Sequence, residues 1–351
     1  LSTLEHANIL AILISPFVRH TKVVIREANT ATVDTDARSL RGRSLLAAMR
    51  LVYPFAGSVI AVSEGVATEL KAKLGVKAER ISVIPNPVLN SEVFAKAREP
   101  VSDPWLDGAL PLVLAVGRLV PQKGFDVLLK AFAKVRSRTE ARLIVLGEGP
   151  LRSELEQQAE DLGIGEHVRF PGFISNPYAY MSGADVFVLS SRWEGLPNVL
   201  IQAMGVGAPA VATDCKSGPS EVLEGGRFGH LVPVDDNDSM ASAILEALDG
   251  DRRLVDEAWK EGYLVSGVAD RYAERGITAP FPIQSQTIPL GLEGQDIIGQ
   301  AKTGTGKTLG FGLPLLQALG TDPAPGVQAL VVVPTRELCV QVAEDLVIAS
   351  S

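Results

Sequence analysis

The stretch SRWEGLPNVLIQAM, Ser191–Met204, decides the fold. An apolar run typical of a buried strand, residues 185–190, comes directly before it, and a helix-forming run begins near Asn198. The Gly-Leu-Pro between them predicts a tight turn. Strand, turn and helix in this order leave free backbone N–H groups that can hold a phosphate. A lone acid before a helix is often only a helix-dipole partner, but we expect Glu194 to point into a cleft.

A second stretch, VGRLVPQKG at residues 116–124, has the same arrangement of strand, turn and helix. Arg118 and Lys123 place two cations near this turn. The arginine fork can donate two hydrogen bonds to a phosphate, and the lysine acts as a point charge. Taken alone, the segment fits a phosphate site and a solvated basic turn about equally well.

Strand-like and helix-like segments alternate through the first 250 residues. The strand-like runs are Lys22–Ile25, Ser58–Val62, Leu112–Val116, Leu143–Leu146, Val186–Leu189 and Pro209–Thr213. Helix-like runs include Phe125–Arg136, Leu151–Leu162 and Asn198–Gly205. This alternation predicts an α/β protein with parallel sheets covered by helices on both faces. The Pro-, Asp- and Gly-rich segment 97–108 is interpreted as a linker between two doubly wound domains, with a ligand cleft between them.

The composition is that of a globular chain: 46% of the 351 residues are hydrophobic and 21% are charged. The net charge of −8 argues against a general nucleic-acid binder. Two cysteines, Cys215 and Cys339, and four scattered histidines suggest neither a disulfide framework nor a metal cluster. No apolar run reaches the ~20 residues that a membrane span needs.

Several further motifs, in a fixed order, resemble the retaining glycosyltransferases of family 4, the group 1 transferases with the two-domain GT-B fold. Besides the two stretches above they are AVSEG at 61–65, IPNPV at 84–88, LGEGP at 146–150, FPGF at 170–173 and TDCKSGPSE at 213–221. The resemblance covers about residues 1–273 and is greatest to bacterial transferases that build lipopolysaccharide, capsule or other surface polysaccharides. It implies two Rossmann-like domains, the first of them truncated.

The resemblance also implies the roles of individual residues. Arg118 and Lys123 would hold the diphosphate of a nucleotide-sugar donor and neutralise the charge that grows on it. Glu194, the first acid of the family's Glu-x7-Glu motif, would be catalytic and contact the transferred sugar. Phe173 would lie at the nucleotide base. The other donor-binding residues would be Gly117, Gly195, Leu196, Pro197, Asn198, Val199 and Gln202. The family needs neither metal nor cofactor.

One donor-binding position departs from the family pattern. The second acid of the motif is replaced by Gln202, where the family uses a carboxylate to bind the ribose hydroxyls. A glutamine side chain can still donate and accept hydrogen bonds, but it carries no charge. We therefore expect weaker donor binding rather than lost chemistry.

The acceptor side is less complete. Family members carry further strand–helix units and a Gly-rich acceptor loop before the segment that matches residue 1, so we expect residues 1–96 to be a remnant of the acceptor domain. His6 is a minor candidate for a catalytic role. Four arginines fit an anionic membrane surface or a lipid-linked acceptor. A solvated helix face is the favoured interpretation of this group: Arg38, Arg41, Arg43 and Arg50.

A different motif lies near the end of the chain. The loop AKTGTGKT, residues 301–308, follows the strand-like run 296–299 and matches a P-loop with Ala in place of the first Gly. The backbone at Gly304, Thr305 and Gly306 would wrap the phosphates of ATP. Lys307 would reach the β- and γ-phosphates, and Thr308 would ligate Mg²⁺.

The motifs on either side of this loop resemble those of DEAD-box RNA helicases. GITAPFPIQ at 276–284 resembles the family's Q motif, in which Gln284 would read adenine, and PTREL at 334–338 would contact RNA through Thr335 and Arg336. This implies a partial RecA-like segment. Its acidic box and second RecA domain would lie beyond the last residue, so we expect no ATPase or unwinding activity. Seven acids against four bases in 274–351 argue against RNA binding by this form.

These interpretations give four segments: 1–96, the acceptor-side remnant; 97–251, the donor domain; 252–273, the closing helices of the transferase; and 274–351, the helicase-like part. The expected function is sugar transfer from a nucleotide-diphosphate sugar to a polysaccharide, lipopolysaccharide or lipid-linked acceptor with retention of configuration. An ATP-binding helicase fragment and a non-functional chimera are the alternatives. The expected location is cytoplasmic, with contact at the inner face of the membrane.

Overall fold

A computed structural model describes residues 5–14, 24–28, 40–106, 108, 110–251 and 253–265, all within one compact unit, Leu4–Arg271. The predicted ATP and RNA residues between 284 and 336 lie outside the described residues, as do Arg38 and the side chains of His6 and Arg41. Among the described helices, none combines the length and the apolar character that crossing a membrane requires.

The first sheet has three parallel strands in the order β1-β2-β3, and helices α1, α3 and α4 accompany it. β1 extends to Glu27, beyond the predicted end at Ile25. Helix α4 begins after Ser63, whose Oγ accepts a hydrogen bond from the Val66 amide, and ends at Gly75 in the left-handed region. The elements are α1 (Glu5–Ile14), β1 (Val24–Glu27), α3 (Leu40–Val52), η2 (Tyr53–Phe55), β2 (Ser58–Ala61), α4 (Glu64–Leu74), η3 (Ala78–Arg80) and β3 (Ile81–Val83).

The second sheet has six parallel strands in the order β6-β5-β4-β7-β8-β9. The chain runs outward from β4 to β6 and then returns to place β7 on the other side of β4, which makes the β4/β7 boundary the topological switch point. The strands are β4 (Leu112–Val116), β5 (Arg142–Leu146), β6 (Val168–Gly172), β7 (Val186–Leu189), β8 (Ala210–Thr213) and β9 (His230–Val232). The helices are α5 (Ser91–Ala97), η4 (Pro121–Lys123), α6 (Phe125–Arg136), α7 (Arg152–Asp161), η5 (Gly165–His167), α8 (Pro177–Gly183), α9 (Asn198–Gly205), α10 (Pro219–Val222), η6 (Glu224–Gly226), α11 (Asn237–Leu248) and α12 (Glu257–Glu261).

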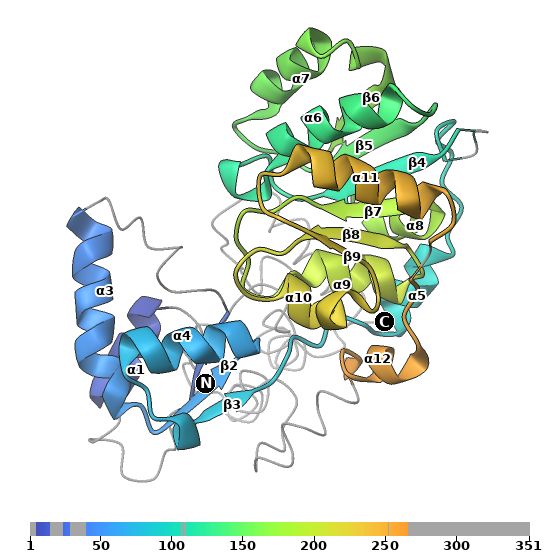
Figure 1. The fold of residues 1–351 in the computed structure, drawn as a ribbon. Helices are drawn as coiled ribbons and strands as arrows, with labels where there is room; N and C mark the ends of the chain where they lie inside the picture. The colour runs from blue at the N-terminus through green and yellow to red at the C-terminus, as the bar shows by residue number, and fades with distance from the viewer. Residues whose placement is uncertain are drawn as a thin grey trace, which may run out of the picture. The chain divides into compact units, whose positions relative to one another are not determined.

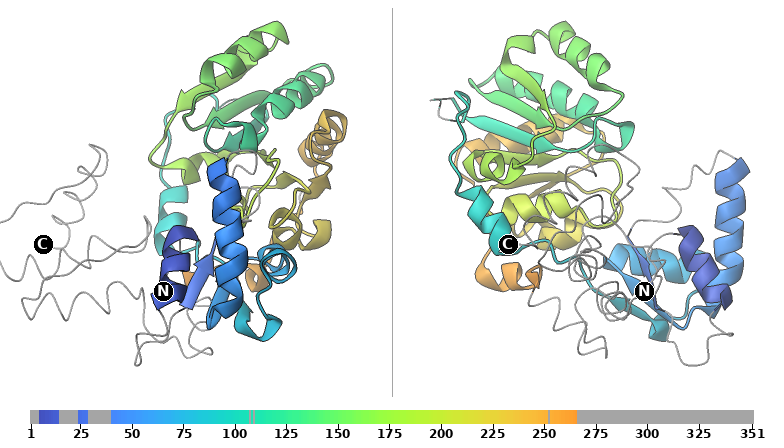
Figure 2. Two further views of the ribbon diagram at one scale, coloured as in Figure 1. Left: turned by 90° about the vertical axis from the view of Figure 1, so that its left-hand side faces the viewer. Right: turned by 180° about the vertical axis from the view of Figure 1, so that it is seen from behind.

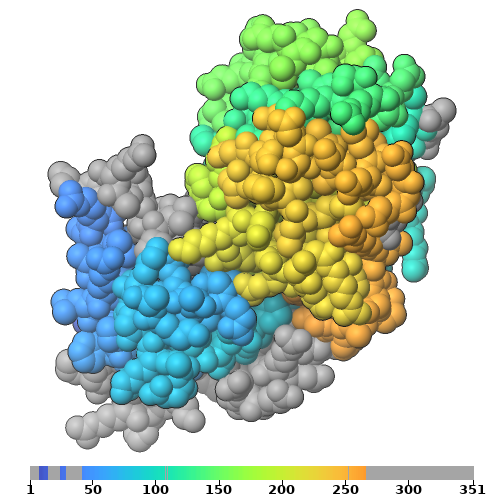
Figure 3. Space-filling view, viewed as in Figure 1, coloured from blue at the N-terminus to red at the C-terminus, as the bar shows by residue number. Residues whose placement is uncertain are grey.

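Successive strand residues of the second sheet point into two different cores. In β4, Leu112 and Leu114 join the core formed with α8 and α9, whereas Val113 and Ala115 join the core formed with α6, α7 and α11. Both faces of the sheet are therefore covered by helices (Figure 1, Figure 2). In the space-filling view, the side chains of α6 and α11 hide the strands beneath them (Figure 3). The predicted α/β fold with parallel sheets is confirmed.

The segment predicted to be a linker packs on the second sheet. Trp105 is buried, with the guanidinium carbons of Arg169 and Arg142 at 4.1 and 5.2 Å from its ring centroid. At the other end of the described chain, α12 is anchored by Trp259, whose ring nitrogen donates a 2.8 Å hydrogen bond to the carbonyl of Val222. The described part of 252–273 thus contains a single short helix.

Candidate active site

The two motifs that the sequence singled out lie side by side at the switch point. VGRLVPQKG follows β4 and SRWEGLPN follows β7, and these two strands are neighbours in the sheet. Because parallel strands end at the same edge, both motifs lie at the carboxyl edge, where doubly wound sheets bind their ligands.

The turn after β4 depends on a glycine. Gly124 has a φ of 62°, in the left-handed region, and a Cβ on it would lie 2.1 Å from the carbonyl oxygen of Ser190. The Ser190 hydroxyl donates a 2.7 Å hydrogen bond to the carbonyl of Lys123. The backbone of the turn is thus fixed directly against the end of β7.

This close approach brings the predicted cation and the predicted acid together. Lys123 Nζ donates to Glu194 Oε1 at 2.5 Å, and the two side chains are only 17% and 8% exposed. The hydroxyl of Ser191 donates to the same oxygen at 2.7 Å. Since both charges are largely withdrawn from water, each strongly depends on the other for compensation.

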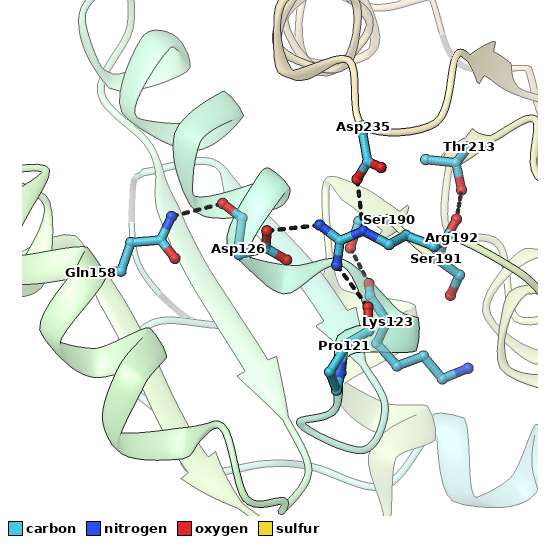
Figure 4. A network of polar contacts seen from close by, with 9 residues as sticks. All are labelled: Pro121, Lys123, Asp126, Gln158, Ser190, Ser191, Arg192, Thr213 and Asp235. Carbon is cyan, nitrogen blue, oxygen red and sulfur yellow. Dashed lines mark hydrogen bonds and ion pairs between the residues drawn. The ribbon is translucent and has the colours of Figure 1, made fainter. Parts of the chain in front are cut away.

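Arg192 connects the loop after β7 to the turn after β4, to α6 and to the loop after β9 (Figure 4). Its Nη2 pairs with Asp126 of α6, its Nε pairs with Asp235 after β9, and its Nη1 donates to the carbonyl of Pro121, each at 2.7 Å. The hydrogen bond to Asp126 is the largest cause of the raised pKa of Arg192. Farther along the edge, the hydroxyl of Thr213 donates to the carbonyl of Ser191.

A thiol also lies beside the ion pair. Burial, followed by the negative charge of Glu194, raises the pKa of the free Cys215 from 9.0 to about 12. The side chain is therefore a neutral thiol at physiological pH and not a nucleophilic thiolate.

Three other predicted donor residues lie in different environments. Arg118 is exposed, and its guanidinium makes no ion pair or hydrogen bond with any residue that the structure describes, which leaves it available to an anion. Phe173 is 77% exposed. Gln202 is half-buried and donates to the hydroxyl of Tyr178 at 3.5 Å, the long limit for a hydrogen bond.

The predicted phosphate-binding helix begins at Asn198, as expected. No side chain caps the start of α9, so its first N–H groups have no such partner. Gly195 accepts a 3.0 Å hydrogen bond from the hydroxyl of Ser63, and Asn198 accepts one of 2.7 Å from the amide of Asn86. The loop that carries Glu194 therefore also contacts residues that follow β2 and β3 of the first sheet.

Sequence reasoning assigned no role to several residues that organise this edge. Glu221 accepts hydrogen bonds from the amides of Glu64 and Gly65 at 2.7 and 2.9 Å, at the first turn of α4. Ser191 and Arg192 were part of the quoted stretch, but only the folded loops show which partners they meet. The spacing of acids and bases in the sequence carried no signal for these contacts.

The structure also brings one histidine close to acids, at the opposite edge. His230, at the start of β9, has its ring nitrogens 3.5 Å from Glu246 and 3.4 Å from Asp251. Asp251 is paired with Arg253 as well, at 2.8 Å. This cluster lies at the amino edge of the sheet, away from the two motifs at the carboxyl edge.

Family models match three parts of the chain. Residues 7–89 match "Glycosyltransferase Family 4", residues 110–250 match "Glycosyl transferases group 1", and residues 281–350 match "DEAD/DEAH box helicase".

Curated relatives divide in the same way. An N-acetylgalactosaminyltransferase of Campylobacter jejuni that acts on a diphospho-undecaprenol-linked sugar is 32% identical over 254 residues, which are 71% of this chain and 66% of the relative. The lipopolysaccharide core biosynthesis glycosyltransferase LpsD of Rhizobium meliloti is 34% identical over 48% of this chain and 47% of its own length. The RNA helicase CshA of Streptococcus pneumoniae is 58% identical over 22% of this chain and 15% of its own length. The chain thus spans about half to two thirds of the curated glycosyltransferases that it matches.

Solved structures share the fold. Sucrose-phosphate synthase from Thermosynechococcus elongatus superposes with a TM-score of 0.66 at 22% identity, covering 78% of this chain and 71% of that one. Anabaena Alr3699/HepE in complex with UDP gives 0.65 at 22% identity, covering 79% of each chain. The predicted GT-B architecture is confirmed by these neighbours.

Proposed function

Because the chain belongs to the glycosyltransferases, matching family 4 over residues 7–89 and group 1 over residues 110–250, we propose that it transfers a sugar from a nucleotide-diphosphate sugar to a polysaccharide, lipopolysaccharide or lipid-linked acceptor with retention of configuration. The observation that carries the proposal is the ion pair between Lys123 and Glu194 at the switch point of the second sheet. A paired cation and acid at this edge, beside an uncapped helix start, suit a substrate that carries both phosphate and hydroxyl groups.

In the proposed reaction, the bond between the sugar's anomeric carbon and the diphosphate breaks, and a bond to the acceptor hydroxyl forms on the same face. The acceptor proton passes to an oxygen of the departing phosphate. Lys123 and Arg118 neutralise the charge that develops on the diphosphate, which lowers the barrier electrostatically. Glu194 contacts hydroxyls of the transferred sugar.

The other proposed donor contacts come from residues in the loops and helices at the carboxyl edge of the sheet. The backbone from Gly195 to Val199, at the start of α9, accommodates phosphate and sugar oxygens. Phe173, which is largely exposed, is available to stack on the nucleotide base. Gln202 serves the ribose hydroxyls in place of a carboxylate. Because two side-chain cations attend the diphosphate, we propose that the transfer needs no metal or other cofactor.

Peripheral contact with the cytoplasmic face of a membrane is the proposed way of reaching a lipid-linked acceptor. Leu10 and Leu13 of α1, Leu51 of α3 and Phe55 of η2 are each more than half exposed. Exposed arginines on α3 would add attraction to anionic lipids. Flotation with vesicles tests this: binding should require anionic lipid and fall in Phe55→Ser, and equal binding to neutral vesicles would contradict the arginine contribution.

The match of residues 281–350 to the helicase model supports a second proposal, ATP binding by that segment. Gln284 would read adenine, Lys307 and Thr308 would hold the phosphates and Mg²⁺, and Thr335 and Arg336 remain the predicted RNA contacts. Lys307→Ala removes the proposed phosphate-binding cation and is the variant that tests this proposal.

A thermal-shift screen with UDP-sugars, GDP-sugars and ATP tests both proposals on the full chain. Stabilisation by a sugar nucleotide that Lys123→Met abolishes supports the transferase. Stabilisation by ATP that Lys307→Ala abolishes supports the helicase segment. A chain stabilised by neither class of ligand behaves as a non-functional chimera, and the transferase proposal is then wrong.

A further inference from the structure

Arg192 lies two positions before Glu194, close to the cation Lys123 that we propose to bind the donor diphosphate. The geometry around its guanidinium does not suit the same role. Two of its nitrogens pair with the carboxylates of Asp126 and Asp235, and a third donates to the carbonyl of Pro121, each at 2.7 Å. The guanidinium charge is therefore compensated within the protein and its hydrogen-bonding fork is occupied.

These contacts join three loops that are far apart in the sequence. The carbonyl of Pro121 belongs to the turn after β4, Asp235 belongs to the loop after β9, and Arg192 itself follows β7 (Figure 4). All three loops leave the carboxyl edge of the sheet. Two further bonds attach the first turn to the β7 loop: the amide of Arg192 donates to the carbonyl of Gln122 at 2.7 Å, and the Gln122 side chain donates to the carbonyl of Trp193 at 2.8 Å.

The Asp235 partner is held in an unfavourable backbone conformation. Its φ of 60° lies in the left-handed region, which aspartate adopts more readily than most non-glycine residues, so the surrounding contacts compensate a modest strain. The ion pair with Arg192 supplies such compensation on one side of the loop. Loss of the guanidinium would therefore loosen the loop after β9 and remove the bond to Pro121, so that the turn carrying Lys123 would be held only by the bonds of Gln122 and Ser190.

We propose that Arg192 is a positioning residue for sugar transfer: it holds the turn Pro121–Lys123 against the β7 loop, so that Lys123 stays beside Glu194, and it does not bind the diphosphate itself. The catalytic consequence rests on the proposed glycosyltransferase function. The structural part, that Arg192 immobilises this turn, stands independently of it.

The sign of the effect of Asp126→Asn separates positioning from direct binding. If Arg192 positions the turn, Asp126→Asn and Asp235→Asn both lower kcat/KM for the donor, and Arg192→Gln lowers it by roughly 10²-fold. Arg192→Lys keeps the charge but not the fork, so it should recover only part of the loss. If Arg192 binds the diphosphate, Asp126→Asn frees the cation and lowers the KM for the donor, which would overturn the proposal.

Amide hydrogen exchange tests the structural part without any turnover. In Arg192→Gln, amides between residues 122 and 128 should exchange faster, whereas amides of β5 should not change. Arg227→Gln is the matched control, because Arg227 also bridges two carboxylates, Glu224 and Asp256, but away from the carboxyl edge. Unchanged exchange at 122–128 overturns the proposal even if the chain proves inactive. If exchange at 122–128 becomes faster in Arg192→Gln but the parent chain binds no sugar nucleotide, the structural part stands and the proposed function is refuted.

Discussion

Glu194→Gln isolates the charge of the buried acid, because the amide oxygen that replaces Oε1 can still accept the hydrogen bonds from Lys123 and Ser191. In the parent chain the ammonium of Lys123 is only 17% exposed and its charge is compensated by the carboxylate at 2.5 Å. Breaking a fully buried pair costs about 3–5 kcal/mol. Since Lys123 keeps some contact with water, we expect a loss of about 2 kcal/mol in the free energy of unfolding, or roughly 4–8 °C in Tm.

The same substitution should strengthen the binding of a nucleoside diphosphate. In the parent chain, an incoming diphosphate competes with Glu194 for Lys123 and is repelled by the carboxylate. Relief of that competition by about 1 kcal/mol corresponds to a Kd for the diphosphate that is roughly fivefold lower. Sugar transfer should nevertheless fall by about 10²-fold or more, because the acid that we propose to contact the sugar has lost its charge.

Calorimetric titration with UDP and GDP, denaturant unfolding and a transfer assay together measure these three effects. Glu156→Gln is the control, because Glu156 is exposed and pairs with Arg152 at the surface, where an ion pair contributes about 0–1 kcal/mol. An unchanged free energy of unfolding in Glu194→Gln, or weaker binding of the diphosphate, would refute the reasoning that Glu194 and Lys123 compensate each other.

Restoring the carboxylate with Gln202→Glu should tighten donor binding, and an unchanged donor Kd in calorimetry would count against a ribose-binding role. Gly124→Ala should lower the free energy of unfolding by about 2 kcal/mol or more because the new Cβ meets the carbonyl of Ser190, whereas Gly163→Ala, also at positive φ but in open space, should cost about 1 kcal/mol. Burial raises the pKa of Cys215 to about 12, so the folded chain binds more protons than the unfolded chain between about pH 9 and 12, and the stabilisation present below pH 9 is lost as the pH rises. By pH 10 the parent chain should therefore lose about 1 kcal/mol more than Cys215→Ala in urea unfolding, and equal losses would contradict the shift. Transfer should persist in excess EDTA, and its loss, reversed by added Mg²⁺ or Mn²⁺, would disprove metal-independent chemistry.

Much of the fold could be predicted from local sequence, because continuous apolar runs, which are typical of strands buried on both faces, and the helices between them are properties of short segments. The runs at Leu112–Val116 and Val186–Leu189 were placed correctly, and α9 begins at Asn198 as predicted. A helix within 252–273 was expected, but the shortness of α12 and the burial of Trp105 were not anticipated. Both depend on which side chains are available in the folded chain to bury an aromatic ring.

The sequence alone determined that two anion-suited turns, each after a buried strand, carry Lys123 and Glu194, and that a P-loop segment follows in 274–351. Only the tertiary structure decided that these two residues, 71 positions apart, form one ion pair, and that Arg192 is occupied by Asp126 and Asp235. The physical reason is the strand order. The chain returns to place β7 beside β4 in the sheet, and this brings loops that are distant in sequence to one edge. Opposite charges on these loops are then close enough to form ion pairs.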